Sequence, residues 1–539
     1  MAAKSMSQTK LATPLAAALA VCAALAIPYA VLTPASTDLA AQAFRAELFA
    51  DSGPLVWSEA WYGGFHLPGY SFLFPPLAAL VGVHLTGALT ALGAAGLFAL
   101  LAQRRSAGRA ALIGSVWFAL GAGAWLYTGR LTFLLGVTVG LGALLAADLR
   151  RPIAAGALAT LTALASPVAG VFVAVAGIAV GLAGARRAGA ALALPAAAAT
   201  MFAGLAFPTT GEAPFTFSSF VAVPLFVAGA LLVVPREQRA VRIGIVLYGL
   251  LALAVFAIPN PLGGNVVRLG ALFGGPLAAL CLRSPALLLV VAAPLLYWQL
   301  DAPVRDARAG AGDPATEAAF FEPLLDQLDR RGIADGQPMR RIHIPPTANR
   351  WEAVHVGERL ALARGWLRQL ESDDFELFDN GNLTPAAYAT WLEDHGVSYV
   401  AVPDAELDWI GRDEVALIDS GLPFLEPIWE EEDWRLYRVD PEPPLVSAIA
   451  GPEAGADRGS GRAPSLRRLG PGRFELDAET GHYLVRLAWT PYWELDGARA
   501  CASEEAGWTR IDVAGSGTVE LAARFRIAGL GGRERICSG

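Results

Sequence analysis

Residues 11–32, LATPLAAALAVCAALAIPYAVL, form an apolar run without a charged side chain, and TPASTDLAAQAFRAELFADSGPLVWSEAWYGGFHLPGYSFLFPP follows at 33–76. The first run is long enough to cross a bilayer, which takes roughly 20 apolar residues. The second stretch is polar and carries four carboxylates and a histidine: Asp38, Glu47, Asp51, Glu59 and His66. Because charge is costly beside hydrocarbon, such a cluster indicates a functional loop.

The composition of the whole chain is that of a membrane protein with a soluble part. The 539 residues are 54% hydrophobic and 17% charged, with a mean hydropathy of +0.45, whereas soluble proteins average roughly 25% charged residues. Only seven of the 49 Asp and Glu residues precede residue 301. An apolar, faintly basic half is therefore followed by an acidic half, and neither has the basic face that nucleic-acid binding needs.

About eleven transmembrane spans are expected in residues 1–300. The apolar runs lie at 11–32, 84–102, 110–128, 131–148, 153–166, 168–184, 188–206, 218–235, 243–258, 266–282 and 285–300. The stretch 153–184 can also be a kinked hairpin broken at Ser166-Pro167. For residues 1–30, a basic start and an apolar run leave a cleaved signal peptide as a second interpretation.

The charges between the runs predict the orientation. Most Arg and Lys residues of this half fall in alternate loops, which the positive-inside rule places in the cytoplasm. The 33–76 loop falls in the other set and is expected outside. With an odd number of spans, residues 301–539 lie on the same outer face of the plasma membrane.

The outer half divides into three parts by pattern. Residues 301–440 combine an amphipathic helix at 313–333, strands at RIHIP and SYVAVP and a helix that starts at Thr384-Pro385, which predicts a small α/β domain. Residues 441–465 are rich in Pro, Gly and Ala and are expected to be a linker. Alternating segments in 466–539 predict an antiparallel β-sandwich. A disulfide between Cys501 and Cys537 is plausible on the oxidising side, and two free thiols are the alternative.

Asp38 has two compatible interpretations. A partly desolvated carboxylate at the outer end of the first span is suited to act as a general base. Ser36-Thr37-Asp38 is equally typical of the cap of a helix that runs through DLAAQAFRAELF.

The aromatic residues of the same loop also have two interpretations. Trp61, Tyr62 and His66 are typical of the aromatic belt at a membrane surface, and they can also stack on or bond to a sugar. HExxH, CxxC, Walker and GxGxxG patterns do not occur in the sequence, so the usual metal and nucleotide sites lack support.

Two arginines fall in later outer loops, Arg130 in YTGRLTF and Arg268 in NPLGGNVVRLG. A guanidinium close to hydrocarbon needs a partner, and phosphate is a natural bidentate one. Asn265 adds a donor beside Arg268. The competing interpretation is that both arginines extend to lipid headgroups.

The arrangement resembles the GT-C superfamily of membrane glycosyltransferases, and more closely the YfhO-type bacterial proteins and their actinobacterial relatives. The resemblance rests on STDLAAQ after the first span, on GVSYVAVP at 396–403, and on GHYLVRLAWTPYWELDG and GSGTVELAARF near the C-terminus. It implies a polyprenyl-phosphate sugar donor, a glycan or lipid acceptor, and Asp38 as the catalytic base. The residues expected to bind these substrates are Arg268, Arg130, Asn265, His66, Trp61, Tyr62 and Gln42.

The sequence departs from some GT-C families because it lacks their paired Asp-Glu and a clear metal site. No cofactor is predicted, and a divalent metal is left open. The expected function is a membrane glycosyltransferase acting at the outer face. The alternatives are a transporter or flippase of lipid-linked precursors, and a non-catalytic membrane protein of envelope assembly.

Overall fold

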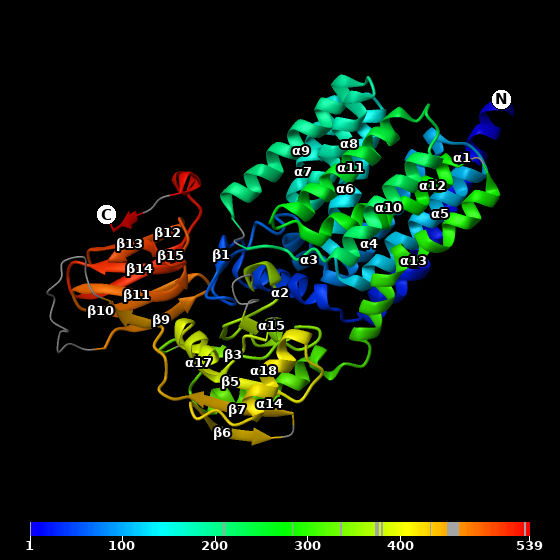
Figure 1. Ribbon diagram of the computed structural model, residues 1–539. Coiled ribbons are helices and arrows are strands. Elements are labelled where there is room, and N and C mark those ends of the chain that lie inside the picture. Colours follow the sequence, from blue (N-terminus) through cyan, green and yellow to red (C-terminus); the bar gives the residue numbers. More distant parts are fainter. Residues whose placement is uncertain are drawn as a thin grey trace. The chain divides into compact units, whose positions relative to one another are not determined.

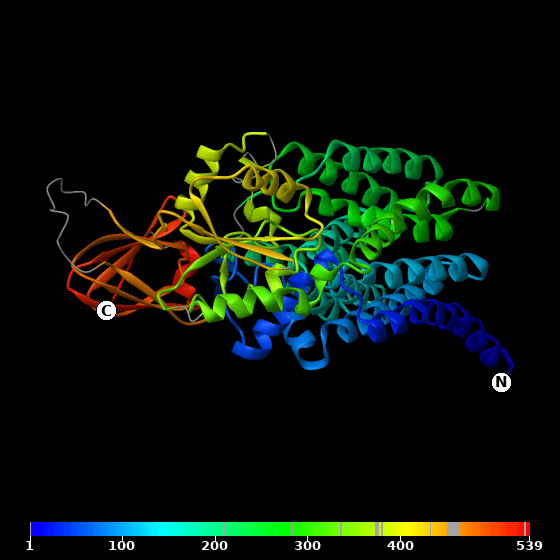
Figure 2. The same ribbon diagram turned by 90° about the horizontal axis from the view of Figure 1, so that it is seen from below.

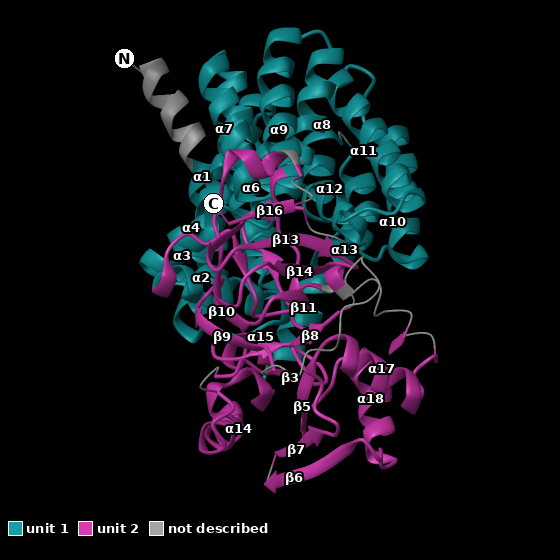
Figure 3. Ribbon diagram, turned by 90° about the vertical axis from the view of Figure 1, so that its left-hand side faces the viewer, with its two compact units in different colours: residues 1–50, 69–205, 210–311 teal, residues 51–68, 206–209, 312–539 magenta. Residues whose placement is uncertain are grey.

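The computed structural model describes residues 2–208, 211–282, 284–334, 337–371, 377–378, 381–431, 433–449, 463–532 and 535–538. The chain forms two compact units, coloured separately in Figure 3. Unit 1 comprises residues 1–50, 69–205 and 210–311. Unit 2 comprises residues 51–68, 206–209 and 312–539.

Unit 1 is built of apolar helices that lie side by side in both Figure 1 and Figure 2. Within the described residues, eight segments are long and apolar enough to cross a membrane. They contain α1 (Ala2–Leu32), α4 (Val83–Arg105), α5 (Arg109–Ala124), α6 (Leu131–Asp148), α9 (Arg186–Ala206), α11 (Arg239–Ala257), α12 (Val267–Cys281) and α13 (Pro285–Gly310). Three shorter apolar helices are α7 (Pro152–Ala165), α8 (Pro167–Leu182) and α10 (Phe217–Val233). The chain is a multi-pass membrane protein.

The helices of unit 1 occupy the apolar runs of the sequence, and the break expected at Ser166-Pro167 separates α7 from α8. The Ser166 hydroxyl accepts a hydrogen bond from the Ala169 amide and so caps α8. Helix α13 continues to Gly310, ten residues beyond the last apolar run.

One buried amide joins three of these helices. The Gln299 side chain accepts a hydrogen bond from the Trp117 indole (2.9 Å) and donates to the Leu272 carbonyl (3.1 Å). The Gln299 backbone carbonyl accepts from the Trp125 indole (3.0 Å). Such interhelical hydrogen bonds hold apolar helices in register, because a lost bond leaves a buried polar group unsatisfied.

The 33–76 stretch is divided between the two units. Helix α2 (Thr37–Ser52) follows α1 and confirms the helix expected after Ser36-Thr37-Asp38. The hairpin β1 (Trp57–Ser58) and β2 (Phe65–His66) lies in residues 51–68 of unit 2. Helix α3 (Phe74–Val81) returns the chain to unit 1.

Residues 312–440 form a mixed five-stranded sheet with helices. The strands are β3 (Arg341–His343), β4 (Ala361–Leu362), β5 (Val397–Pro403), β6 (Leu425–Glu431) and β7 (Trp434–Val439), in the order β4-β3-β5-β7-β6. The helices are α14 (Ala318–Arg330), α15 (Glu352–His355), α17 (Pro385–Asp394) and α18 (Trp409–Asp419). Strand β3 is parallel to β4 and β5, and β7 is antiparallel to its neighbours. As expected, β5 is buried throughout and Thr384 caps α17.

The C-terminal sheets are two antiparallel sheets, β12-β15-β10-β9 and β16-β13-β14-β11-β8, whose buried residues form one core. The strands are β8 (Val446–Ala448), β9 (Ser465–Gly470), β10 (Arg473–Ala478), β11 (Gly481–Ala488), β12 (Trp493–Gly497), β13 (Ala500–Glu505), β14 (Trp508–Val513), β15 (Gly517–Ala523) and β16 (Arg535–Cys537). Strand β8 lies inside the expected linker, of which 450–462 fall outside the described residues. Cys501 and Cys537 form a disulfide between paired strands.

Candidate functional site

Charged side chains from three segments of unit 1 meet at the start of α2. Asp38 lies in the first turn of this helix, and its Oδ2 is 2.5 Å from Nε of Arg130. Nη2 of Arg130 is 3.7 Å from Oδ2 of Asp306 on α13. All three side chains are mostly buried. Two residues that the sequence suggested separately therefore bind each other, and Asp306 joins them.

Two glycines allow the backbones to come close enough for these contacts. Gly129 has a φ of +73°, and a Cβ at this position would lie 2.2 Å from the Leu39 amide nitrogen. A Cβ at Gly310 would lie 2.2 Å from the Ala35 carbonyl oxygen. Any larger residue would push the Arg130 turn or the end of α13 away from the start of α2.

Arg268 belongs to the same electrostatic neighbourhood but is bound differently. It interacts through charge with Arg130, Asp38 and Asp306, and its guanidinium lies 5.5 Å from the centre of the Phe133 ring. Among the described residues, Arg268 has no carboxylate within ion-pair distance and no hydrogen-bond partner. A half-buried guanidinium of this kind can accept an anion that is not part of the chain.

A polar stripe continues from Asp38 along α2. Gln42 and Arg45 follow at helical spacing, and both are buried. The Gln42 amide donates to the Tyr70 hydroxyl (3.2 Å), and the Arg45 guanidinium lies 4.3 Å from the centre of the Tyr70 ring. Burial lowers the pKa of Arg45 to about 10, so the side chain keeps its charge at neutral pH. Gln42 thus lies on the same helix face as Asp38.

Asn265 lies in the turn η2 (Gly263–Val266) directly before α12, close in sequence to Arg268. The side chain that shapes this turn is Asn260, whose oxygen accepts from the amides of Leu262 (2.9 Å) and Gly263 (3.0 Å). Asn260 was not among the predicted residues, although an Asn followed by Pro261, three residues before Gly263, is a common turn signal.

The three aromatic site candidates belong to unit 2 rather than to the Asp38 cluster. The Trp61 indole donates to the Ala353 carbonyl (2.9 Å) and its ring stacks on Phe65. The Tyr62 hydroxyl donates to the Gly365 carbonyl (2.7 Å). His66 lies between the Pro208 carbonyl (3.1 Å) and the Thr490 hydroxyl (3.0 Å). Their polar atoms thus join the 51–68 segment to the rest of unit 2.

A carboxylate of the same segment is fully buried. Glu59 lies 2.5 Å from Nε of Arg468 and accepts from the Gly472 amide (2.9 Å). A buried carboxylate needs such partners because desolvation is otherwise costly. Glu59 therefore has a structural role that explains its place in the cluster of ionisable residues.

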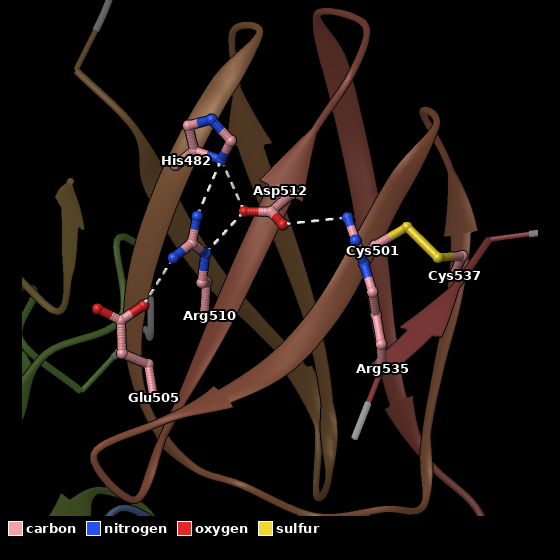
Figure 4. A network of polar contacts seen from close by, with 7 residues as sticks. All are labelled: His482, Cys501, Glu505, Arg510, Asp512, Arg535 and Cys537. Carbon is pink, nitrogen blue, oxygen red and sulfur yellow. Dashed lines mark hydrogen bonds and ion pairs between the residues drawn. A yellow bond between two sulfur atoms is a disulfide. The ribbon is translucent and has the colours of Figure 1, made fainter. Parts of the chain in front are cut away.

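A second polar network lies on one of the C-terminal sheets, β16-β13-β14-β11-β8 (Figure 4). Asp512 accepts hydrogen bonds from His482 (2.7 Å), Arg510 (2.8 Å) and Arg535 (3.3 Å). Burial acts to raise the pKa of Asp512, but the bonds from His482 and Arg510 outweigh it and hold the pKa below its ordinary range. The network joins β11, β14 and β16, and Arg510 also pairs with Glu505 of β13 (3.1 Å).

A third cluster lies inside the α/β part. The Glu414 carboxylate contacts His343 (2.5 Å), the Tyr388 hydroxyl (2.8 Å) and Arg364 (3.7 Å), and all four side chains are buried. Burial acts to raise the pKa of Glu414, but His343, Arg364 and Tyr388 outweigh it and lower the pKa. The burial of all four side chains favours a structural role.

Within the part of the chain that the structure describes, no three His, Cys, Asp or Glu side chains are placed so that they could hold a metal ion. The Asp38 cluster is therefore the arrangement that best combines charge, partial exposure and a free guanidinium. No protein-family model matches the sequence, and no curated protein is significantly similar to it.

Proposed function

We propose that this protein is a membrane glycosyltransferase that moves a sugar from a polyprenyl-phosphate donor to a glycan or lipid acceptor. The observation that carries the proposal is the pairing of Asp38 with Arg130 next to Arg268, which has no carboxylate partner among the described residues. A carboxylate and an arginine that can take an anion are the two groups that such a transfer needs.

In this proposal Arg268 holds the donor phosphate and Asp38 is the general base. Arg130 contacts two carboxylates, Asp38 and Asp306, so we assign it to positioning Asp38 rather than to the phosphate. Oδ2 of Asp38 faces Arg130, which leaves Oδ1 to accept the proton of an acceptor hydroxyl. Gln42 and Tyr70 support the same face of α2.

The transfer is a single displacement with inversion at the sugar. The acceptor oxygen forms a bond to the anomeric carbon and its proton passes to Asp38. The bond from the anomeric carbon to the phosphate oxygen breaks, and its electron pair leaves with the polyprenyl phosphate. The Arg268 guanidinium stabilises the charge that develops on that phosphate, as preorganised donors do in other group transfers.

We also propose that the Asp38 cluster and unit 2 face the outside of the plasma membrane. Three features support this orientation. The loops that carry most of the Arg residues alternate with the one that contains Asp38. The Cys501–Cys537 disulfide is typical of an oxidising compartment. With the three shorter apolar helices included, the number of crossings is odd among the described residues, which would place the Asp38 loop and unit 2 on the same face of the membrane.

The proposal is tested with Asp38→Asn in proteoliposomes supplied with radiolabelled polyprenyl-phosphate hexoses and pentoses and an envelope glycan fraction as acceptor. Loss of a general base reduces the rate by about 10²–10⁴-fold. Glu47→Gln removes a charge from an exposed position of the same helix and is expected to leave transfer unchanged. Undiminished transfer by Asp38→Asn would exclude the assigned role.

The donor site has its own test. Arg268→Gln is expected to raise KM for the labelled donor more than it lowers kcat, and Arg268→Lys is expected to recover part of the loss because it restores the charge without the bidentate geometry. Transport of the labelled lipid across the bilayer without transfer of its sugar would favour a flippase instead.

A further inference from the structure

An aromatic cluster of unit 2 packs around residues 206 and 207, which end and directly follow α9. Ala206 is the last residue of α9, and its carbonyl accepts a hydrogen bond from the Tyr492 hydroxyl (2.6 Å). The next residue, Phe207, lies 5.8 Å from the ring of Tyr492 and 5.7 Å from the ring of Phe525. These contacts are all within unit 2.

Because the cluster binds the last residue of α9, the position of α9 in the membrane indicates where the cluster lies. The helix is one of the segments long and apolar enough to span a bilayer. Near its end, Met201 and Leu205 are exposed to 63% and 71%, as side chains that face lipid would be. Since Ala206 ends the helix, the Tyr492 ring that binds it lies where the hydrocarbon meets the headgroups. Tyr and Trp are enriched at this depth in membrane proteins.

Next to Tyr492, the 525–530 turn (FRIAGL) exposes apolar side chains. Phe525 packs 5.4 Å from Tyr492 but remains 44% exposed, Ile527 is 79% exposed and Leu530 is 36% exposed. The backbone is held in place because the Arg524 amide donates to the Tyr492 carbonyl (2.9 Å). Three exposed apolar side chains on one short turn are costly in water and need a partner.

Basic side chains flank the same turn. Arg524 and Arg526 are each 61% exposed, and both contact Glu494. Apolar residues between arginines are the pattern of segments that rest in the membrane interface, where the apolar side chains enter the acyl boundary and the cations reach lipid phosphates.

We propose that the 525–530 turn docks on the bilayer surface where α9 ends. The inference does not depend on the transferase proposal, because it rests on the Tyr492 cluster and on the apolar character of α9. The turn would enter the interface by about 5–10 Å, the depth typical of interfacial segments. The C-terminal sheets would then be held to the membrane at two adjacent points, through Tyr492 on Ala206 and through Ile527 in lipid.

The test uses the full chain in phosphatidylcholine nanodiscs, with Cys22 and Cys281 replaced by alanine. An environment-sensitive fluorophore is attached at Ile527→Cys, or at Ser516→Cys as the matched control. Ser516 is exposed at the opposite end of β15, about 20 Å away for a strand of this length. Lipids with a nitroxide near the headgroup end of the acyl chain report contact with the membrane, and iodide reports contact with water.

We expect lipid-nitroxide quenching to be several-fold stronger at position 527 than at position 516. Iodide quenching should be stronger at position 516 than at position 527. Equal iodide quenching at both positions would overturn it, because the turn would then be in water. Protection of position 527 from both quenchers would also overturn it, because another protein surface would then cover the turn. Leu530→Cys provides a second reporter if the first variant does not fold.

Discussion

Helix α2 and the 51–68 segment are adjacent in sequence but use their polar residues in opposite ways. In α2, Asp38 contacts other side chains of unit 1, and its cluster keeps some exposure. In the 51–68 segment, Glu59 and Trp61 are fully buried, and their polar atoms bind groups of unit 2. The first arrangement can respond to a ligand, whereas the second has its partners supplied by the chain.

The ionisable residues of the 33–76 stretch therefore belong to two different kinds of site. Both halves of the 33–76 stretch meet the expectation that charge beside apolar residues needs a reason. For Glu59 the reason is a fixed ion pair with Arg468. For Asp38 it is a group of charges in which Arg268 has no carboxylate partner among the described residues. Burial and the kind of partner distinguish the two.

The largest effect is expected from removing the central anchor of the 51–68 segment. Trp61→Ala leaves a cavity beside Phe65 and removes the bond to Ala353, so unit 2 should lose about 3–5 kcal/mol of its free energy of unfolding. Pulse proteolysis in urea measures this loss in detergent. The control is Trp409→Ala, whose side chain is 45% exposed, and for which a clearly smaller loss is expected. Equal effects of both variants would contradict the anchoring role.

The next largest effect tests whether close packing at the start of α2 creates the Asp38–Arg130 contact. Gly129→Ala places a methyl group 2.2 Å from the Leu39 amide nitrogen at a φ of +73°. The positive φ should cost about 1–2 kcal/mol, and the overpacking should add about 1–3 kcal/mol. Gly53→Ala, at a φ of +70° with open space around it, should show the first cost alone. Equal losses of thermal stability in Gly129→Ala and Gly53→Ala would mean that Gly129 is not closely packed against Leu39.

A smaller effect is expected when the buried carboxylate loses its charge. Glu59→Gln keeps an acceptor for the Gly472 amide but removes the ion pair with Arg468. Because Arg468 keeps some exposure to water, the expected loss in the free energy of unfolding is about 1–3 kcal/mol. Glu520→Gln removes the exposed pair with Arg473 and should cost at most about 1 kcal/mol. A Glu59→Gln loss no larger than that would show that the 51–68 segment is held by its aromatic rings alone.

The sequence predicted best those features that depend on neighbouring residues. The apolar runs became the helices of unit 1 because hydropathy over a span is a local property. The Thr384 cap and strand β5 followed from spacing and side-chain type. The start of α2 followed in the same way, and Asp38 lies in its first turn with its carboxylate on Arg130.

Contacts between distant segments could not be predicted in this way. Asp306 lies in DAPVRDARAG, which looks like an ordinary polar helix end, and its approach to Arg130 depends on the packing allowed at Gly310. Glu59 and Arg468 are separated by 409 residues. The assignment of Trp61, Tyr62 and His66 to unit 2 depends on partners such as Ala353 and Thr490, which no local pattern connects with a membrane loop.

The smallest effect concerns pH and tests the anchoring role of His66 in the 51–68 segment. His66 donates from Nδ1, since the Pro208 carbonyl only accepts, and Nε2 then accepts from the Thr490 hydroxyl. Burial lowers the pKa of His66 more than the bond to Pro208 raises it. In the unfolded chain His66 has the ordinary histidine pKa of about 6.5. On acidification the unfolded chain therefore binds a proton at His66 more readily than folded unit 2 does. The contribution of His66 to stability is present above pH of about 6.5 and is lost as the pH falls towards the lowered folded pKa.

The pH dependence that Glu352 gives to the stability of unit 2 has the opposite sign. Burial raises the pKa of Glu352 to about 7, so its contribution to stability is lost as the pH rises through that value. The two slopes partly cancel in the wild-type protein, so the difference between variants is the quantity to measure. His66→Gln should remove the loss of unit 2 stability on acidification from pH of about 7 to about 5, and Glu352→Gln should change the slope in the other direction. If His66→Gln leaves the slope unchanged, the histidine is not held neutral in the folded state, and the anchoring role assigned to its two hydrogen bonds fails.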